Sequence, residues 1–363
     1  MTAASDSPLR GSLLGIILHD VCEEIRLEQL RQILDAKRTT QVFKHPMPEY
    51  VRFANPPVVE TLDLISLSSG ERIQPQVKYY DYGVVSVLLE LPLETDWQRV
   101  AGVAANWVPS AELEKIAEEV VRGRIQKIAP AMVRPNNHWL TEDYYVFLLN
   151  EVDGQPQGAE LLKEYGPQIA QIVSGERMEL APAERDDLLQ ASLSYYPKDL
   201  IVIGWNAALI YDTRTGADPS MQILEYANSQ LLEFRYYDEL LTRELDSVYK
   251  SLKARAGMWK RWRMRREASR LNTVALEVTD LVERADTAIK FVSEMFSARL
   301  YRLAAAKVGV PEYKNLVNEK LKMSEGVYRF LIDEFHQSSG FVLELMVVII
   351  LIIELFFLFR GKG

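Results

Sequence analysis

The chain has little of the chemistry that marks most enzymes. It contains a single cysteine, Cys22, which excludes an internal disulfide and fits a reducing compartment. Its four histidines stand singly, so none has the spacing of a metal-binding pair. No glycine-rich phosphate loop and no G-x-S-x-G nucleophile motif occurs. We therefore predict a protein that is not an enzyme, with no catalytic residue, no cofactor and no metal site.

The N-terminus has no charged segment followed by an apolar one, so no signal peptide is expected. Residues 1–10 are predicted to be flexible. The net charge of −9 argues against the whole molecule being a nucleic-acid binder. We expect a cytoplasmic body.

Residues 11–212 alternate between strand and helix patterns. Apolar, β-prone runs predict a strand at 12–21, two strands joined by a turn at 81–83, a strand starting at 141, and a hairpin around 204–206. Helical patterns lie between them, at 96–105, 110–127, 158–173 and 182–193. The pattern predicts an α+β fold class, with a mixed α/β body built on an antiparallel sheet.

From about residue 217 onward only helical periodicity is found, and 217–337 is predicted to be an antiparallel helical coiled-coil stalk. Its helices are expected at 219–258, at 267–308 and after the break at Gly309 and Pro311. The second helix carries a heptad repeat of apolar residues, namely Leu271, Val274, Val278, Leu281, Ala285, Ala288, Val292 and Met295. Heptads of this kind pair either within one chain or between chains, and both remain open.

A basic cluster with two tryptophans separates the first two predicted helices, within residues 250–270. Its candidate contact residues are Trp259, Lys260, Arg261, Trp262, Arg263, Arg265 and Arg266. Three interpretations fit this cluster: contact with anionic lipid headgroups, contact with RNA or a ribosome, and a plain solvated turn.

The segment 341–359 is apolar on nearly all faces and, as a helix, about 28 Å long. That length predicts a single C-terminal transmembrane helix, hence a tail-anchored protein of the cell inner (cytoplasmic) membrane. Glu344 and Glu354 interrupt the run. They are interpreted either as an intramembrane helix contact between subunits or as glutamates tolerated near the interfaces.

The loop 212–220 (DTRTGADPS) has two interpretations: an anion site at a helix N-terminus, and an ordinary hinge with an N-cap.

Two segments carry a resemblance to a known family: LELMVVIILIIEL at 343–355, with its Glu-x9-Glu, and the preceding helix at 299–335. They resemble the required-for-meiotic-nuclear-division (YagE-like) proteins, which are grouped with the sporulation Sif-type proteins. The resemblance implies a membrane-anchored, oligomer-forming protein of no known catalytic activity. It also implies, for a eukaryotic member, the mitochondrial inner membrane, where such proteins support translation.

These patterns together predict a non-catalytic, tail-anchored membrane scaffold or tether. It would form a homo-oligomer through its stalk or its membrane helix and present the cytoplasmic body to a protein partner. The alternative is an RNA- or ribosome-associated membrane protein that supports translation through the basic cluster at 250–270.

Overall fold

The computed structural model describes residues 9–34, 39–40, 51–53, 55–67, 70, 72–253, 266–267, 269–279, 282, 289–291 and 295–360. Side chains are described for these residues except at 39–40, 51–53, 252–253, 289–291, 334–346 and 355–360. The described chain divides into two compact units, which are treated separately below. Unit 1 is Met1–Tyr236 with Glu283–Tyr313, and unit 2 is Tyr237–Val282 with Lys314–Gly363.

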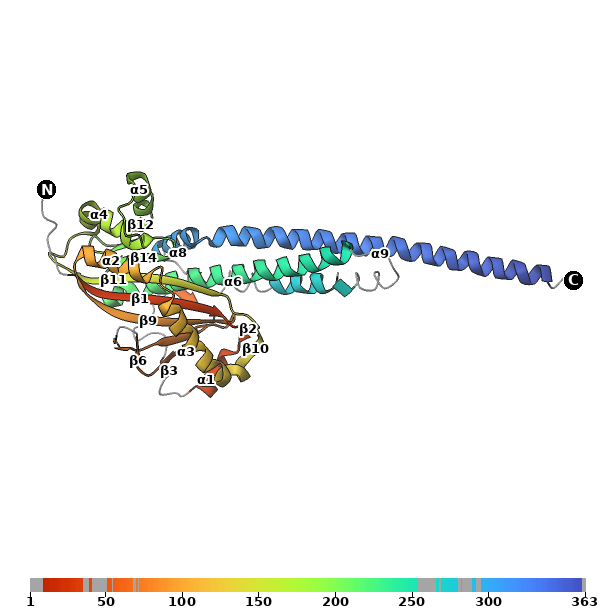
Figure 1. Cartoon of the computed structure of the whole chain (residues 1–363), viewed down its shortest axis with the longest axis horizontal. Helices are drawn as coiled ribbons and strands as arrows, with labels where there is room; N and C mark the ends of the chain where they lie inside the picture. The colour runs from red at the N-terminus through yellow and green to blue at the C-terminus, as the bar shows by residue number, and fades with distance from the viewer. Residues whose placement is uncertain are drawn as a thin grey trace. The chain divides into compact units, whose positions relative to one another are not determined.

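Unit 1 is built on a nine-stranded sheet in the order β12-β13-β14-β11-β1-β9-β8-β5-β3. Its central strand, β1 (Leu9–Asp20), lies between two long antiparallel strands, β9 (Val84–Thr95) and β11 (Thr141–Val152), as Figure 1 shows. The other six strands are β3 (Thr39–Thr40), β5 (Val58–Thr61), β8 (Gln76–Tyr79), β12 (Ser192–Leu193), β13 (Leu200–Ile203) and β14 (Ala207–Tyr211).

One face of this sheet holds the main apolar core. Leu9, Leu13 and Ile17 of β1 point into it, since alternate residues of a strand share a face. Helices pack over this face: α2 (Trp97–Trp107), α3 (Glu112–Ile128) and α4 (Gly158–Ser174). α2 begins where Asp96 accepts a hydrogen bond from the backbone N–H of Arg99, and α4 begins with a capping box at Gln157.

The opposite face of the sheet is contacted by the first part of a long helix, α6 (Arg214–Lys253). Strand register puts Glu90 opposite Leu14 and Glu142 opposite Leu18, so these carboxylates share one face. α6 presents buried polar side chains to this face, unlike the apolar helices on the other. They include Glu225 and Ser229, which meet Lys78 and Tyr82, whereas the buried Gln230 accepts a hydrogen bond from Tyr301 instead.

Short elements complete unit 1. The helical ones are α1 (Leu27–Ile33), the 3-10 turn η1 (Ala129–Ala131), α5 (Pro182–Gln190) and α8 (Met295–Val308). Two-stranded pairings join β2 (Cys22–Ile25) to β10 (Met132–Pro135), β4 (Val51–Phe53) to β15 (Ile289–Phe291), and β6 (Ile65–Ser66) to β7 (Arg72–Ile73).

The described part of unit 2 is mostly helical. α6 continues into it, residues 269–279 are helical, and α9 (Val310–Arg360) supplies the longest helix. A small apolar core joins Leu245, Val248, Leu271 and Leu331. Arg270 donates to Glu244 at 2.7 Å, and Lys320 contacts Asp238 at 2.5 Å.

The strand and helix positions in 11–212 are largely as predicted, including the turn at Asp81–Gly83 between β8 and β9. Two predictions about the fold are wrong. The sheet is mixed, because β11 and β14 pair in parallel. The predicted helix at 267–308 is not continuous, because β15 interrupts it and pairs with β4.

The predicted transmembrane helix at 341–359 is also wrong. No helix formed by the described residues is long and apolar enough to cross a membrane. The tail-anchored inner-membrane localisation inferred from this segment is withdrawn with it.

Candidate functional site

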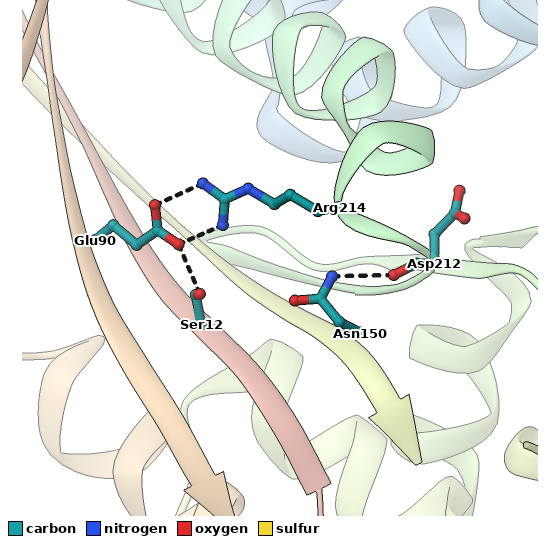
Figure 2. A network of polar contacts seen from close by, with 5 residues as sticks. All are labelled: Ser12, Glu90, Asn150, Asp212 and Arg214. Atoms are coloured by element: carbon teal, nitrogen blue, oxygen red, sulfur yellow. Dashed lines mark hydrogen bonds and ion pairs between the residues drawn. The ribbon is translucent and has the colours of Figure 1, made fainter.

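A polar cluster lies at the carboxyl end of β11 and β14, the one parallel pair among the described strands. Such ends are where open sheets with helices most often bind ligands. α6 begins at Arg214, directly after β14. Figure 2 shows the residues gathered here, which we call the polar clamp: Ser12, Glu90, Asn150, Asp212 and Arg214.

Glu90 is the acceptor at the centre of the polar clamp. Arg214 contacts both of its carboxylate oxygens, with Nη2 to Oε2 at 2.5 Å, and the Ser12 hydroxyl donates to Oε1 at 2.6 Å. Burial alone would raise the pKa of Glu90, but the hydrogen bonds from Arg214 and Ser12 outweigh it and lower that pKa. Glu90 is therefore an ionised carboxylate whose oxygens already have donors within the chain.

Asp212 and Thr213 close the start of α6. The Asn150 amide donates to the backbone oxygen of Asp212 at 3.1 Å, and Asp212 Oδ1 accepts from the Thr213 N–H at 2.6 Å. Thr213 Oγ1 accepts from the Gly216 N–H at 3.1 Å, as an N-cap does. Burial raises the pKa of Asp212, while the Thr213 hydrogen bonds lower it. The helix N-terminus is thus filled by the chain's own side chains, as the hinge interpretation of 212–220 requires.

Further polar contacts follow α6 along the sheet, and with Arg214–Glu90 we call them the anchoring row. The Ser229 and Tyr82 hydroxyls lie 2.8 Å apart, and Tyr236 donates to Asn136 Oδ1 at 3.1 Å. Two ion pairs complete the row, Lys78–Glu225 and Arg235–Glu142.

The pair formed by Lys78 and Glu225 is the most buried ion pair of the row, with side chains 12% and 2% exposed. Ion pairs this deep add little net stability, because both charges lose water. Removing one partner nonetheless destabilises the fold, because the other charge is left buried and unpaired. Such ion pairs therefore fix which groups lie opposite each other. The anchoring row therefore sets the register of α6 on the sheet.

The polar clamp does not have the arrangement of a nucleophilic catalytic centre. The Ser12 hydroxyl donates to a carboxylate whose charge is also neutralised by Arg214, so Glu90 is a weak base. His19 is on the other face of β1, where Nδ1 lies 3.1 Å from Thr141 Oγ1. Within the described residues, no three His, Cys, Asp or Glu side chains group so as to hold a metal ion.

Most of the predicted site residues cannot be placed. Trp259, Lys260, Arg261, Trp262, Arg263 and Arg265 lie outside the described residues, as does the side chain of Glu344. Arg266 is described and exposed, and so is Glu354 on α9. Cys22 is buried, as expected for an inert thiol, and burial raises its pKa to about 12.

The sequence singled out the loop 212–220, which holds Asp212 and Arg214, but it did not point to the other members of the polar clamp or to the anchoring row. Glu90 and Arg214 are 124 positions apart, so no local motif joins them. The available signal was weak: a run of polar residues on one side of a helix otherwise expected to face solvent.

The fold and the anchoring row define a class: an α+β domain whose mixed sheet is fastened to the first part of a long helix. Residues 10–218 match the family described as "Uncharacterized protein MJ0711, N-terminal domain", and the chain belongs to that family. The uncharacterized protein MJ0711 of Methanocaldococcus jannaschii is 19% identical over 214 residues, which are 59% of this chain and 65% of the relative. The chain thus spans about two thirds of the relative's length. No solved structure matches the chain.

The resemblance to the YagE-like and Sif-type proteins is therefore wrong. It rested on the helical half of the chain, whereas the family match covers the α+β body. Coiled-coil and apolar helices resemble one another by composition whatever their descent, because the same spacing of apolar residues recurs in all of them.

Proposed function

We propose that this protein is a non-catalytic scaffold. Its helical unit 2 associates with a second copy of the chain, and its α+β body presents a surface to a partner protein. The observation that carries the proposal is an apolar stripe on α9 made of Leu316, Met323 and Phe330, which are 43%, 51% and 57% exposed.

The stripe has the period of a coiled coil. Its three members are spaced by seven residues, which keeps them on one side of a helix paired with another. Val317, Ser324 and Leu331 form a second seven-residue series next to it, and these are buried. The buried series faces the chain's own helices, since Leu331 packs with Leu245 and Leu271. The exposed series is therefore the face of α9 that a further helix could cover.

A second copy of the chain carries the matching period. In an antiparallel pair centred on Met323, Leu316 lies opposite Phe330 of the other copy. A parallel pair would instead set Glu319 against its own counterpart, and like charges in such a seam are unfavourable. An antiparallel dimer of α9 is the arrangement that these side chains favour.

The contacts of the α+β body also support a scaffold. The charged groups of the polar clamp and the anchoring row bind one another across the sheet and α6. Groups neutralised in this way hold a helix in place and are poorly suited to proton transfer.

The proposal is tested by the mass of the full chain in solution, measured by light scattering across a concentration series. We expect a dimer for the native chain and a monomer for Leu316→Glu combined with Met323→Glu, because two carboxylates in the seam must be desolvated. The control is Asn318→Glu, a substitution of the same charge about 140° around the helix from the stripe. Circular dichroism checks that each variant folds. A folded stripe variant with the native mass would refute the proposal.

A further inference from the structure

Unit 1 carries a cluster of exposed aromatic side chains away from the polar clamp. Tyr195 and Tyr196 lie in the loop between β12 and β13, and Met295 and Phe296 begin α8. Three of them are strongly exposed: Tyr195 at 58%, Tyr196 at 66% and Met295 at 80%. Together with Arg299 they are called the aromatic patch.

The rings of the aromatic patch contact one another. Tyr195 meets Tyr196 edge to face, with centroids 4.7 Å apart, and meets Phe296 at 5.1 Å in the same manner. The Arg299 guanidinium lies 5.9 Å from the Phe296 ring centroid. Large side chains gathered on a surface in this way mark interaction sites, and aromatic residues, Met and Arg are enriched where proteins bind one another.

A buried carboxylate holds the two tyrosines outward. Asp199 is 9% exposed, and its two oxygens accept the backbone N–H groups of Tyr195 at 2.7 Å and of Tyr196 at 2.8 Å. The backbone oxygen of Pro197 accepts from Gly158 N–H at 2.9 Å. The loop is therefore fixed before any partner arrives, and pre-organisation of this kind lowers the entropy lost on binding.

Within the two segments that form the patch, the exposed charges are of one sign. Across the two segments that form it, 192–199 and Met295–Arg302, the exposed charged residues are Lys198, Arg299 and Arg302. The sole acid of these segments, Asp199, is buried and engaged by the loop backbone. If two copies of the chain paired through this patch, their positive charges would face each other, which is unfavourable. An acidic partner is therefore favoured over a second copy of the same surface.

We propose that the aromatic patch docks an acidic segment of a partner protein, with an apolar side chain seated against Tyr195 and Phe296 and carboxylates on Lys198 and Arg299. This inference rests on the proposed scaffold function and names the chemistry of its partner. Single-stranded RNA fits less well: bases stack on exposed ring faces, whereas these rings meet one another at 84° and 71°.

The test uses the full chain and three fluorescent probes: a short peptide of aspartates and glutamates around a central Leu-Trp, the same peptide with lysine in place of every acid, and oligouridylate. Anisotropy should report salt-dependent binding of the acidic peptide alone. Tyr195→Ala combined with Tyr196→Ala should weaken it at least about tenfold. Tyr249→Ala, which removes another exposed tyrosine in unit 2, should leave it unchanged.

Charge reversal makes the test independent of folding losses. Lys198→Glu combined with Arg299→Glu should bind the lysine peptide in preference to the acidic one. The proposal would be overturned if the charge-reversed variant still preferred the acidic peptide, or if the native chain bound both peptides equally well. The proposal would also be overturned if the native chain bound oligouridylate more tightly than the acidic peptide and the tyrosine variant lost that binding. Loss of the dimer in the tyrosine variant would overturn it as well. The stripe variant Leu316→Glu with Met323→Glu should keep peptide binding, so the two proposals fail separately.

Discussion

Two neighbouring residues of β1 should give the stability of unit 1 an unusual dependence on pH. Asp20 and His19 lie on opposite faces of the strand and are 2% and 0% exposed. Burial raises the pKa of Asp20 to about 8, although the amide of Asn136, 2.9 Å from Oδ1, lowers it and Glu23 raises it further. Burial lowers the pKa of His19 to about 4, with Glu118 opposing the shift.

The two residues change the free energy of unfolding with pH in opposite directions. Between pH 4 and 6.5 the folded state binds fewer protons at His19 than the unfolded state, so this residue makes stability rise with pH. From pH 3.8 to 8 the folded state binds more protons at Asp20, so that residue makes stability fall as pH rises. Each slope is at most about 1.4 kcal/mol per pH unit. They cancel below pH 6.5, and above it only Asp20 acts, which removes about 2 kcal/mol by pH 8.

The variant Asp20→Asn isolates this effect, because its amide resembles the protonated acid and keeps an oxygen for Asn136. Urea unfolding is followed by tryptophan fluorescence from pH 5 to 8.5. Between pH 5 and 8 the native chain should lose about 1.4 kcal/mol per pH unit relative to the variant. The variant should gain stability up to pH 6.5 and then stay level.

A control variant, Asp153→Asn, changes an exposed aspartate in the turn after β11. Its curve should follow the native one. If the Asp20→Asn curve also runs parallel to the native curve at every pH, the buried carboxyl is not protonated at neutral pH, and the argument from burial is refuted.

Two further predictions concern single side chains. Lys78→Met leaves Glu225 buried without its cation, and should lower the free energy of unfolding in urea by about 3 to 5 kcal/mol. Arg122→Met breaks the exposed pair with Glu118, and should lower it by less than about 1 kcal/mol. Equal losses in the two variants would contradict the argument from burial of the Lys78–Glu225 pair. Gly83→Ala should reduce stability by more than about 2 kcal/mol, since Gly83 has φ 95° and an added Cβ would lie 1.6 Å from the Cys22 oxygen. The control Gly102→Ala, inside helix α2 with nothing within 4 Å, should stabilise slightly. If Gly83→Ala has no cost either, the turn rearranges.

The longer elements of residues 11–212 could be predicted because each leaves a local signal. Runs of apolar, β-prone residues predicted β9 and β11, and the glycine at the end of Asp81–Gly83 marked a turn that needs positive φ. Which strands pair with one another in the sheet left no such local signal. β1 pairs with strands far along the chain, and the parallel pairing of β14 with β11 follows from the crossover through α4, which local periodicity does not report.

The buried polar face of α6 shows why the site could not be predicted. Glu225 and Glu233 are 2% exposed, yet charged residues on a helix are normally on its solvent side. Their burial depends on partners such as Lys78 in a distant strand. The heptad repeat was misleading in a similar way: Leu271 and Val278 are buried as predicted, but Met295, at the end of the same repeat, is 80% exposed.

The position of β1 at the middle of the sheet has a consequence for folding during synthesis. β1 is made before both of its neighbours in the sheet, β9 (Val84–Thr95) and β11 (Thr141–Val152). Pairings between segments so distant in sequence form slowly, because a long loop must close before any contact rewards it. Until Val152 has emerged, the apolar residues Leu13 to Leu18 lack a neighbour on one side. The nascent body should therefore need protection from aggregation until β11 has been made.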